Sequence, residues 1–282
     1  MIWIFMTAAA LAAVFGIYLL MIRPCVDRRT IIRPFENTMI AHRGLFDNSS
    51  EAPENTAAAF KKAIRGGFGI EMDVQMTADG RLVVFHDWDM KRMAGVNLRI
   101  TSHTYEELKV HPLGVSDERI PLFSDVLKLV NGAVPLVIEI KVGFDYKKTT
   151  QAVAEMLADY HGVYCIECFN PLALAWYRRN RPQVIRGLLS MDFKKDPMKM
   201  PGIVRFILTN LMLNFCAKPD FISYNHEDQK KRGFRLCRKL FGVKTAAWTI
   251  KSEQDLYRAR RRFDMFIFDS FLPCCEEEVG KE

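Results

Sequence analysis

From Thr38 onward, short apolar runs alternate with amphipathic stretches of helical periodicity, and this alternation constrains the fold more than any other feature. The runs are rich in Val, Ile and Phe, and strands that alternate with helices are typical of a parallel sheet with crossover helices. Eight runs are assigned as strands: Met39–His42, Gly69–Gln75, Leu136–Ile140, Val163–Phe169, Val184–Leu189, Asp220–Tyr224, Lys244–Ile250 and Met265–Asp269. Eight such units predict a closed β/α barrel, an α/β fold of about 250 residues.

A ninth strand-like run, Leu82–His86, follows the second strand too closely to join the barrel in parallel. A parallel crossover needs about a dozen residues or more. The intervening Asp79-Gly80 pair is instead a strong hairpin signal. We therefore expect a distorted TIM barrel with a β-hairpin after its second strand, folded so that His86 lies alongside Glu71 and Asp73.

The first 22 residues contain no charged side chain. As a helix they would rise about 33 Å, enough to cross a hydrocarbon core of about 30 Å. A cleaved secretory signal would need a basic start and a small-residue cleavage site, and neither is present. We therefore favour one transmembrane helix over a cleaved signal or a buried helix.

The orientation of this helix follows from its flanking charges. Four arginines come directly after it, and positive flanks favour the cytoplasmic side of a membrane: Arg23, Arg28, Arg29 and Arg33. The seven cysteines, an odd number, suggest no paired disulfide framework, which fits a reducing compartment. The sequence predicts a single-pass protein of the cell membrane with its main domain in the cytoplasm.

Four segments are expected along the chain: a transmembrane anchor at 1–22, a basic juxtamembrane linker at 23–37, a barrel domain at 38–273 and an acidic tail at 274–282. The net charge of +7 could hold the domain against an anionic leaflet, attract anionic substrates or form a solvated surface. The segment Ile203–Phe215 is unusually apolar for a surface helix, and we expect it to face the core. The alternative is a helix that faces a membrane or admits lipid.

Three carboxylates mark the ends of two predicted barrel strands. Glu71 and Asp73 lie two residues apart on one strand, so their side chains share a face, and Glu139 lies near the carboxyl end of the next parallel strand. Unpaired carboxylates at a barrel mouth are costly, and a hard divalent cation with oxygen ligands neutralises them. We expect Mg²⁺ or Ca²⁺, with Mn²⁺ possible, because a thiolate-preferring metal does not suit oxygen ligands.

Two histidines and two cations accompany the carboxylates. His42 ends the first predicted strand and His86 ends the hairpin strand, so both imidazoles would face the cluster and divide proton transfer as general acid and base. Arg43 and Lys141 are suited to non-bridging phosphate oxygens, and they could equally neutralise the carboxylates.

These residues stand in motifs that resemble the glycerophosphodiester phosphodiesterase family, in the family's order and from Met39 to Phe271. The motifs are His42-Arg43-Gly44, Pro53-Glu54-Asn55-Thr56, Glu71-x-Asp73, His86-Asp87, Glu139-Ile140-Lys141 and Trp248-Thr249. A membrane-anchored member of bacterial type is suggested.

The resemblance implies a distorted barrel that hydrolyses glycerophosphodiesters to glycerol 3-phosphate and an alcohol. Carried over residue by residue, it implies Glu71, Asp73 and Glu139 as metal ligands and His42 and His86 as acid and base. Substrate contacts are implied for four further residues: Arg43, Lys141, Phe169 and Trp248. A buried barrel tryptophan is the alternative for Trp248. In the family's reaction a glycerol hydroxyl attacks phosphorus, and water then opens the cyclic phosphate.

Departures from the family pattern affect no proposed ligand or proton carrier. Cys168 replaces the small polar residue usual before Phe169, Phe268 replaces a common Thr, and Lys251 replaces a common Asn. These changes bear on the fit of the leaving group.

The sequence leaves three alternatives open. Lysophospholipase D action would use the same chemistry on a lysolipid. A related inositol-lipid phospholipase C barrel is less consistent with the Pro53-Glu54-Asn55-Thr56 segment, and a non-catalytic lipid-binding barrel would have been supported by the loss of a site residue. The expected partners are a small glycerophosphodiester or lysolipid, and the membrane through residues 1–22, with no nucleic acid.

Overall fold

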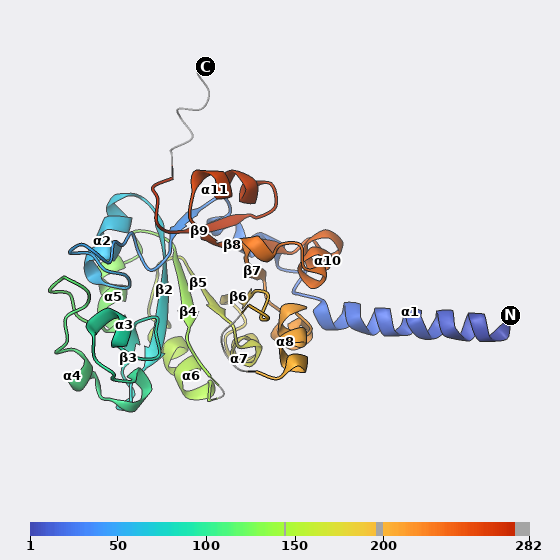
Figure 1. Cartoon of the computed structure of the whole chain (residues 1–282), viewed down its shortest axis with the longest axis horizontal. Coiled ribbons are helices and arrows are strands. Elements are labelled where there is room, and N and C mark those ends of the chain that lie inside the picture. Colours follow the sequence, from blue (N-terminus) through green and yellow to red (C-terminus); the bar gives the residue numbers. More distant parts are fainter. Residues whose placement is uncertain (144, 196–199, 274–282) are drawn as a thin grey trace, which may run out of the picture.

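The computed structural model describes residues 1–143, 145–195 and 200–273, so the predicted acidic tail at 274–282 lies outside the described residues. Its centre is a closed barrel of eight parallel strands, in which β1 pairs with both β2 and β9 (Figure 1). The strands are β1 Met39–Ala41, β2 Gly69–Met76, β4 Leu136–Ile140, β5 Tyr164–Cys168, β6 Ile185–Ser190, β7 Phe221–Asn225, β8 Lys244–Ile250 and β9 Met265–Phe268. The predicted barrel is confirmed.

The ninth strand, β3 (Leu82–Val84), pairs antiparallel with β2 outside the barrel, as the Asp79-Gly80 turn predicted. Its register places Val84 opposite Val74, and the amide of Phe85 donates to the carbonyl of Asp73 over 2.8 Å. Apolar side chains between 83 and 120 form their own small core beneath this hairpin. The hairpin therefore carries the chain from the carboxylate strand directly to His86.

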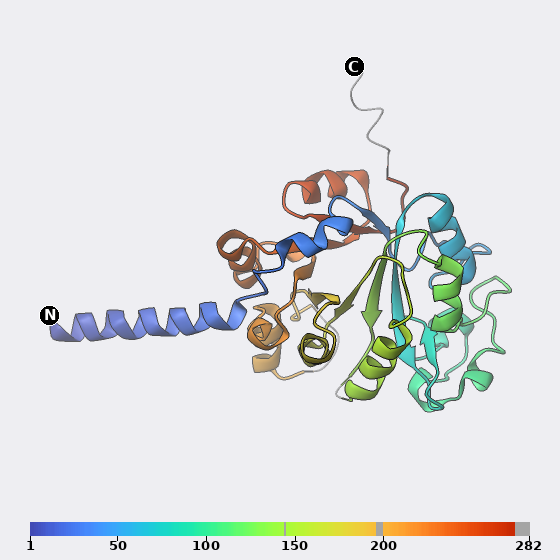
Figure 2. The ribbon, with the colours of Figure 1, turned by 180° about the vertical axis from the view of Figure 1, so that it is seen from behind.

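Helices surround the barrel in both views (Figures 1 and 2). Those of the barrel domain are α2 Ala57–Arg65, α3 Lys91–Ala94, α4 Tyr105–Leu108, α5 Phe123–Val130, α6 Lys147–Met156, α7 Pro171–Asn180, α8 Gly202–Thr209, α9 Asn214–Ala217, α10 Arg232–Phe241 and α11 Glu253–Arg260. Two short 3-10 turns accompany them, η2 Ile100–Ser102 and η3 His226–Asp228. Thr56 caps the start of α2, because its hydroxyl accepts a hydrogen bond from the amide of Ala59.

The segment expected to be a juxtamembrane linker contains a 3-10 helix, η1 (Arg29–Phe35), which reaches the barrel interior. Ile32 and Phe35 are fully buried and pack against inward-facing residues of the strands. Those strand residues are Ile40, Val137, Cys165, Ile185, Phe221, Ala246, Met265 and Ile267. The segment before the first strand therefore contributes side chains to the barrel core as well as connecting it to the N-terminal helix.

We expect Phe35→Ala to lower the free energy of unfolding by about 3–5 kcal/mol, because it removes a buried aromatic ring from a closely packed core. Phe206→Ala makes the same chemical change at a position that is 55% exposed, and should cost about 0.5 kcal/mol or less. Urea unfolding of the purified full chain measures both. Equal stability of the two variants would show that η1 is not part of the barrel core.

The N-terminal helix, α1 (Ile2–Ile22), has 21 residues and extends away from the domain (Figure 1). It is long and apolar enough to cross a membrane. Only its last turns contact the domain, where Tyr18 and Leu19 are partly buried and Ile22 is fully buried. The rest of its apolar surface is uncovered.

The prediction that Ile203–Phe215 forms one core-facing helix is wrong. The helix α8 ends at Thr209, and Leu211 adopts a positive φ of 59° before the separate turn α9 begins. Leu211 is buried, but Ile203 and Phe206 are 65% and 55% exposed. Apolar residues occur on all sides of this segment, so its composition did not reveal which of them reach the core.

Candidate active site

Three carboxylates converge at the mouth of the barrel. In the register of β2 and β4, Asp73 lies opposite Glu139, and Glu71 is on the same face as Asp73. One carboxylate oxygen from each residue lies within 4.8 Å of the others, and all three side chains are buried. The parallel register therefore brings together the ligand set that the sequence predicted.

The buried carboxylates strongly perturb one another. Burial, together with the nearby charges of Asp73 and Glu139, raises the pKa of Glu71 well above its ordinary value. Burial also opposes ionisation of Asp73, but Lys141, His86 and Arg43 outweigh it and lower its pKa. Within the described residues Asp73 Oδ1 accepts no hydrogen bond, and its nearest cation, Lys141 Nζ, is 3.5 Å away. A divalent cation with oxygen ligands fits both the repulsion and the unsatisfied oxygen.

The turn after β1 holds Arg43 against this cluster. Gly44 has a φ of +82°, and a side chain there would come within 2.9 Å of backbone atoms of Ala59 in α2. Glycine is therefore needed both for the turn and for its contact with the helix. The turn directs the amide of Arg43 to Glu71 Oε2 at 3.0 Å, and Arg43 Nε lies 3.4 Å from Asp73 Oδ2.

A second layer of ion pairs supports Arg43. Glu54 is 4% exposed, and its Oε1 accepts from Arg43 Nη1 and Arg92 Nη2, each over 2.7 Å. Burial opposes the ionisation of Glu54, yet the hydrogen bonds from Arg92 and the charge of Arg43 keep its pKa at about 2. Arg92 Nε also donates to Asp87 Oδ2 over 2.7 Å. Arg92 thus links the arginine and histidine sides of the site.

Each histidine is oriented by a carboxylate. His42 Nδ1 donates to Asp269 Oδ2 over 2.8 Å, and His42 Nε2 lies 3.9 Å from Glu71 Oε2. Burial lowers the pKa of His42, although the bond to Asp269 opposes this effect. His86 Nδ1 donates to Asp87 Oδ1 over 2.7 Å. Donation from Nδ1 leaves Nε2 of each ring available for proton transfer with a substrate.

Lys141 follows β4 and is held between carboxylates, with Nζ 3.1 Å from Glu139 Oε1 and 3.5 Å from Asp73 Oδ1. These neighbours outweigh the effect of burial and raise the pKa of Lys141 to about 12. The ammonium group is therefore charged at neutral pH and available as a donor to an anionic oxygen.

Aromatic side chains form another wall. The rings of Phe169 and Trp248 meet edge to face with centroids 5.7 Å apart, and Phe193 contacts Phe169 at 6.1 Å. Trp248 Nε1 is buried and, within the described part of the chain, donates to no acceptor. These aromatic rings therefore offer an apolar surface together with the indole N–H of Trp248 as a donor without an acceptor in the described residues.

Sequence reasoning missed five polar residues that support the site: Glu54, Asp87, Arg92, Glu167 and Asp269. Glu167 lies opposite Glu139 on β5, and burial and the charge of Glu139 raise its pKa to about 8. The alternation of β5 gave a signal for Glu167, since a charged residue occurs at an inward position of an otherwise apolar strand. Glu54 and Asp87 stood in recognised motifs without an assigned role.

A TIM barrel with clustered carboxylates, two carboxylate-bound histidines and nearby cationic side chains is an arrangement suited to a phosphoric diester hydrolase. Comparison with known proteins agrees. Residues 42–270 match the family described as the glycerophosphoryl diester phosphodiesterase family. The chain belongs to this family.

Three similar proteins illustrate the relationship. A glycerophosphodiester phosphodiesterase of Caldanaerobacter subterraneus subsp. tengcongensis is 32% identical over 78% of this chain and 88% of its own length. Human lysophospholipase D GDPD1 is 35% identical over 44% of this chain and 43% of its own length. An Oleispira antarctica phosphodiesterase, solved with the product sn-glycerol-3-phosphate, shares the fold with a TM-score of 0.67 at 24% identity, over 83% of this chain and 93% of its own.

Proposed function

We propose that this enzyme hydrolyses glycerophosphodiesters to glycerol 3-phosphate and an alcohol, with one divalent cation held by Glu71, Asp73 and Glu139. The supporting observation is the approach of the three carboxylates to within 4.8 Å beside two histidines that are each bound by a carboxylate. The proposed ion is Mg²⁺ or Ca²⁺, with Mn²⁺ possible. When bound, such an ion supplies charge neutralisation and acidifies an attacking hydroxyl.

In the proposed reaction His42 is the general base and His86 the general acid. Burial favours neutral His42, whose Nε2 takes the proton from the substrate's free glycerol hydroxyl as that oxygen bonds to phosphorus. The bond from phosphorus to the alcohol oxygen breaks, and His86 protonates that oxygen. Water then opens the cyclic phosphate with the two proton transfers reversed.

The remaining proposed contacts position the substrate. Arg43 and Lys141 donate to non-bridging phosphate oxygens, the first as a planar fork and the second as a point charge. Phe169 and Trp248 form the apolar wall for the glycerol carbons. Asp269 and Asp87 act through the histidines by fixing the ring orientation and the proton-bearing nitrogen.

We also propose that α1 crosses the cell membrane and that the barrel lies on the cytoplasmic side. Its length and apolar character support the span, and the arginines that follow it support the orientation. A protease-protection assay on inside-out and right-side-out vesicles tests the orientation.

A second candidate is lysophospholipase D action on lysolipids, which α1 favours because it would hold the site near a lipid surface. The name of the human relative points the same way. A non-catalytic lipid-binding barrel is less consistent with the chain, because all five of the predicted ligands and proton carriers are present: His42, Glu71, Asp73, His86 and Glu139.

We expect the purified full chain to cleave glycerophosphocholine with a kcat/KM at least about tenfold higher than for a long-chain lysophosphatidylcholine. Both substrates release choline, but glycerophosphocholine lacks the acyl chain on glycerol and therefore needs no acyl pocket; one tenfold step corresponds to about 1.4 kcal/mol of transition-state binding. Coupled detection of sn-glycerol 3-phosphate and of lysophosphatidic acid distinguishes the two reactions. Cleavage of the lysolipid alone would replace the first proposal by the second.

A further inference from the structure

The end of α1 is attached to the two helices that surround it. The carbonyl of Ile22 accepts hydrogen bonds from Asn214 Nδ2 at 2.8 Å and from Cys237 Sγ at 3.3 Å. The first of these donors belongs to α9 and the second to α10. The next carbonyl, that of Arg23, accepts from Lys218 Nζ at 3.2 Å. These bonds fix the side of the domain from which α1 emerges.

On this side, α8 and α10 flank the exit of α1 in both views (Figures 1 and 2), and α1 packs against α9. Apolar side chains are uncovered beside it: Ile203 is 65% exposed, Phe206 55% and Phe215 46%. Exposed apolar side chains next to a membrane-length helix suit the boundary between lipid headgroups and acyl chains.

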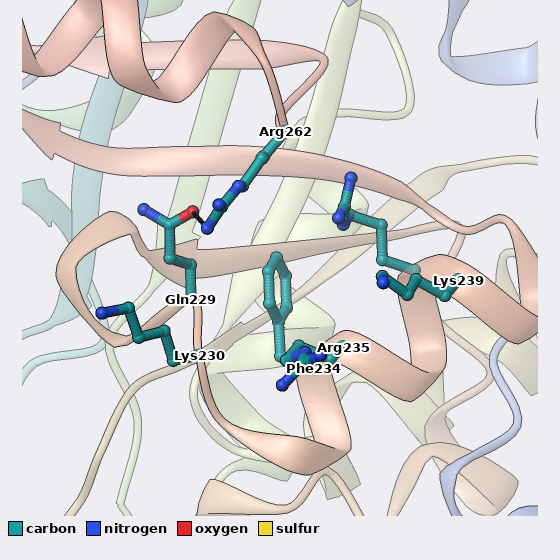
Figure 3. Close-up of a pocket in the computed structure, with 7 residues that line it drawn as sticks. Gln229, Lys230, Phe234, Arg235, Lys239 and Arg262 are labelled. Atoms are coloured by element: carbon teal, nitrogen blue, oxygen red, sulfur yellow. Dashed lines mark hydrogen bonds between the residues drawn. The ribbon is translucent and has the colours of Figure 1, made fainter.

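The other flank is cationic. A cavity of about 320 Å³ lies between α10 and the end of α11, and five of the residues that line it are basic: Lys230, Arg235, Arg238, Lys239 and Arg262. Gln229 and the ring of Phe234 complete the lining, with Phe234 central in Figure 3. Among the described residues no carboxylate lines the cavity. Arg262 donates to Gln229 Oε1 over 2.7 Å, so an uncharged acceptor is its partner there.

Helical geometry places part of this charge on the exposed surface of α10. Cys237 faces inward to α1, as its bond to Ile22 requires, whereas Arg235 and Lys239 lie on the opposite, exposed side of α10. The cationic surface therefore lies on a helix that is hydrogen-bonded to the end of α1.

We propose that the apolar side chains of α8 and α9 and the cationic pocket of α10 form one docking face that binds an anionic bilayer. Ile203, Phe206 and Phe215 enter the headgroup boundary, and Arg235, Arg238 and Lys239 bind lipid phosphate. Charge complementarity selects this occupant, because five cations without a lining carboxylate require anions and α1 brings a lipid surface to them. The inference rests on the proposal that α1 spans the membrane, and it is independent of the reaction catalysed.

Hydrogen exchange of the full chain in nanodiscs tests the docking face. Discs of phosphatidylcholine are compared with discs of equal parts phosphatidylcholine and phosphatidylglycerol. We expect amides of α8 and α10 to exchange about tenfold more slowly in the anionic discs, because docking removes them from solvent. Amides of α2 and α5, which lie on the far side of the domain in Figure 1, should not change.

A matched pair of variants separates specific docking from general charge attraction. The triple change Arg235→Gln, Arg238→Gln and Lys239→Gln should remove the protection of α10. The control, Lys61→Gln, Arg65→Gln and Lys128→Gln, removes the same charge from α2 and α5 and should retain it. Equal protection in both triple variants, or none in the unmodified chain, would overturn the proposal.

Two further controls test whether free phosphate can replace the lipid and whether α1 spans the membrane. Inorganic phosphate added to neutral discs should leave α10 unprotected, and full protection by phosphate alone would make the pocket a site for free anions and overturn lipid docking. Amides of α1 should be protected in both kinds of disc, whereas exchange of α1 in both would refute the membrane span itself. Hydrolysis of glycerophosphocholine by the cationic-pocket variant in detergent should be unchanged.

Discussion

Replacing either His42 or His86 by alanine is expected to lower kcat for glycerophosphocholine by about 10²–10⁴-fold, the usual contribution of a positioned acid or base. Each imidazole has its Nδ1 bound to a carboxylate, so its Nε2 is held in one orientation. Both side chains are partly exposed and neither belongs to the apolar core, so thermal unfolding should change little. Steady-state kinetics and a melting curve measure the two effects.

A substrate with a leaving group that is stable as an anion, such as a glycerol phosphate ester of p-nitrophenol, separates the two roles. Such a leaving group needs no proton, so loss of the acid should cost little and loss of the base should cost as much as before. We expect release of p-nitrophenolate in the first turnover to be largely rescued in His86→Ala and not in His42→Ala, whereas later turnovers of His86→Ala should stay slow because opening of the cyclic phosphate uses His86 as the base. The opposite pattern would exchange the assignments, and undiminished hydrolysis in either variant would remove the mechanism.

His161→Ala is the matched control for these variants. His161 is exposed and precedes β5, so it lies at the end of the barrel away from the strand termini that carry the carboxylates. Its loss should leave both kcat and the melting temperature unchanged. A comparable loss of activity in this variant would indicate a general effect of removing a histidine.

Much of the fold could be predicted because its signals are local. All eight residues of the strand β2 are buried. The Asp79-Gly80 turn after it favours a tight return of the chain. The strand β2 and the antiparallel strand β3 therefore both followed from a short stretch of sequence. The convergence of Asp73 and Glu139 also followed, because parallel strands place equivalent positions side by side.

What could not be predicted depends on long-range packing. Arg92 reaches Glu54 across 38 positions and Asp269 reaches His42 across 227, and no periodicity connects such pairs. The exposure of Phe206 and the burial of Phe35 had the same cause. Phe206 lies in an apolar stretch of sequence and Phe35 between Arg33-Pro34 and Glu36-Asn37, and only the assembled barrel decides which of the two rings is buried.

The contacts of Arg43 show how local sequence signals and long-range packing combine. The short motif around His42 gave its identity, and the turn geometry at Gly44 gave its direction. Its charge, however, is shared with Glu54 and Asp73, and Glu54 is itself held by Arg92. A sequence motif identified the residue that we propose as a phosphate ligand, while the tertiary structure determined how rigidly it is held.

Metal binding should reverse the order of stability between the unmodified chain and Glu71→Gln. In the presence of EDTA the variant should melt at the higher temperature, because burial and the charges of Asp73 and Glu139 disfavour ionised Glu71 and glutamine carries no charge. The glutamine oxygen can still accept the hydrogen bond from the amide of Arg43. Removing the charge therefore relieves repulsion without removing a backbone partner.

With Mg²⁺ or Ca²⁺ at about 100 times its dissociation constant, the unmodified chain should gain about 2.7 kcal/mol, and the variant should gain much less. Melting curves with and without the ion give this result without an activity measurement, and hydrolysis by the unmodified chain should disappear in EDTA and return with the ion. Glu106→Gln, on exposed α4, should gain as much as the unmodified chain. The order of stabilities reverses only if Glu71 repels its neighbours without the ion and binds the ion when it is present. Equal stabilisation of Glu71→Gln and of the unmodified chain by the ion would therefore exclude Glu71 from the ligand set.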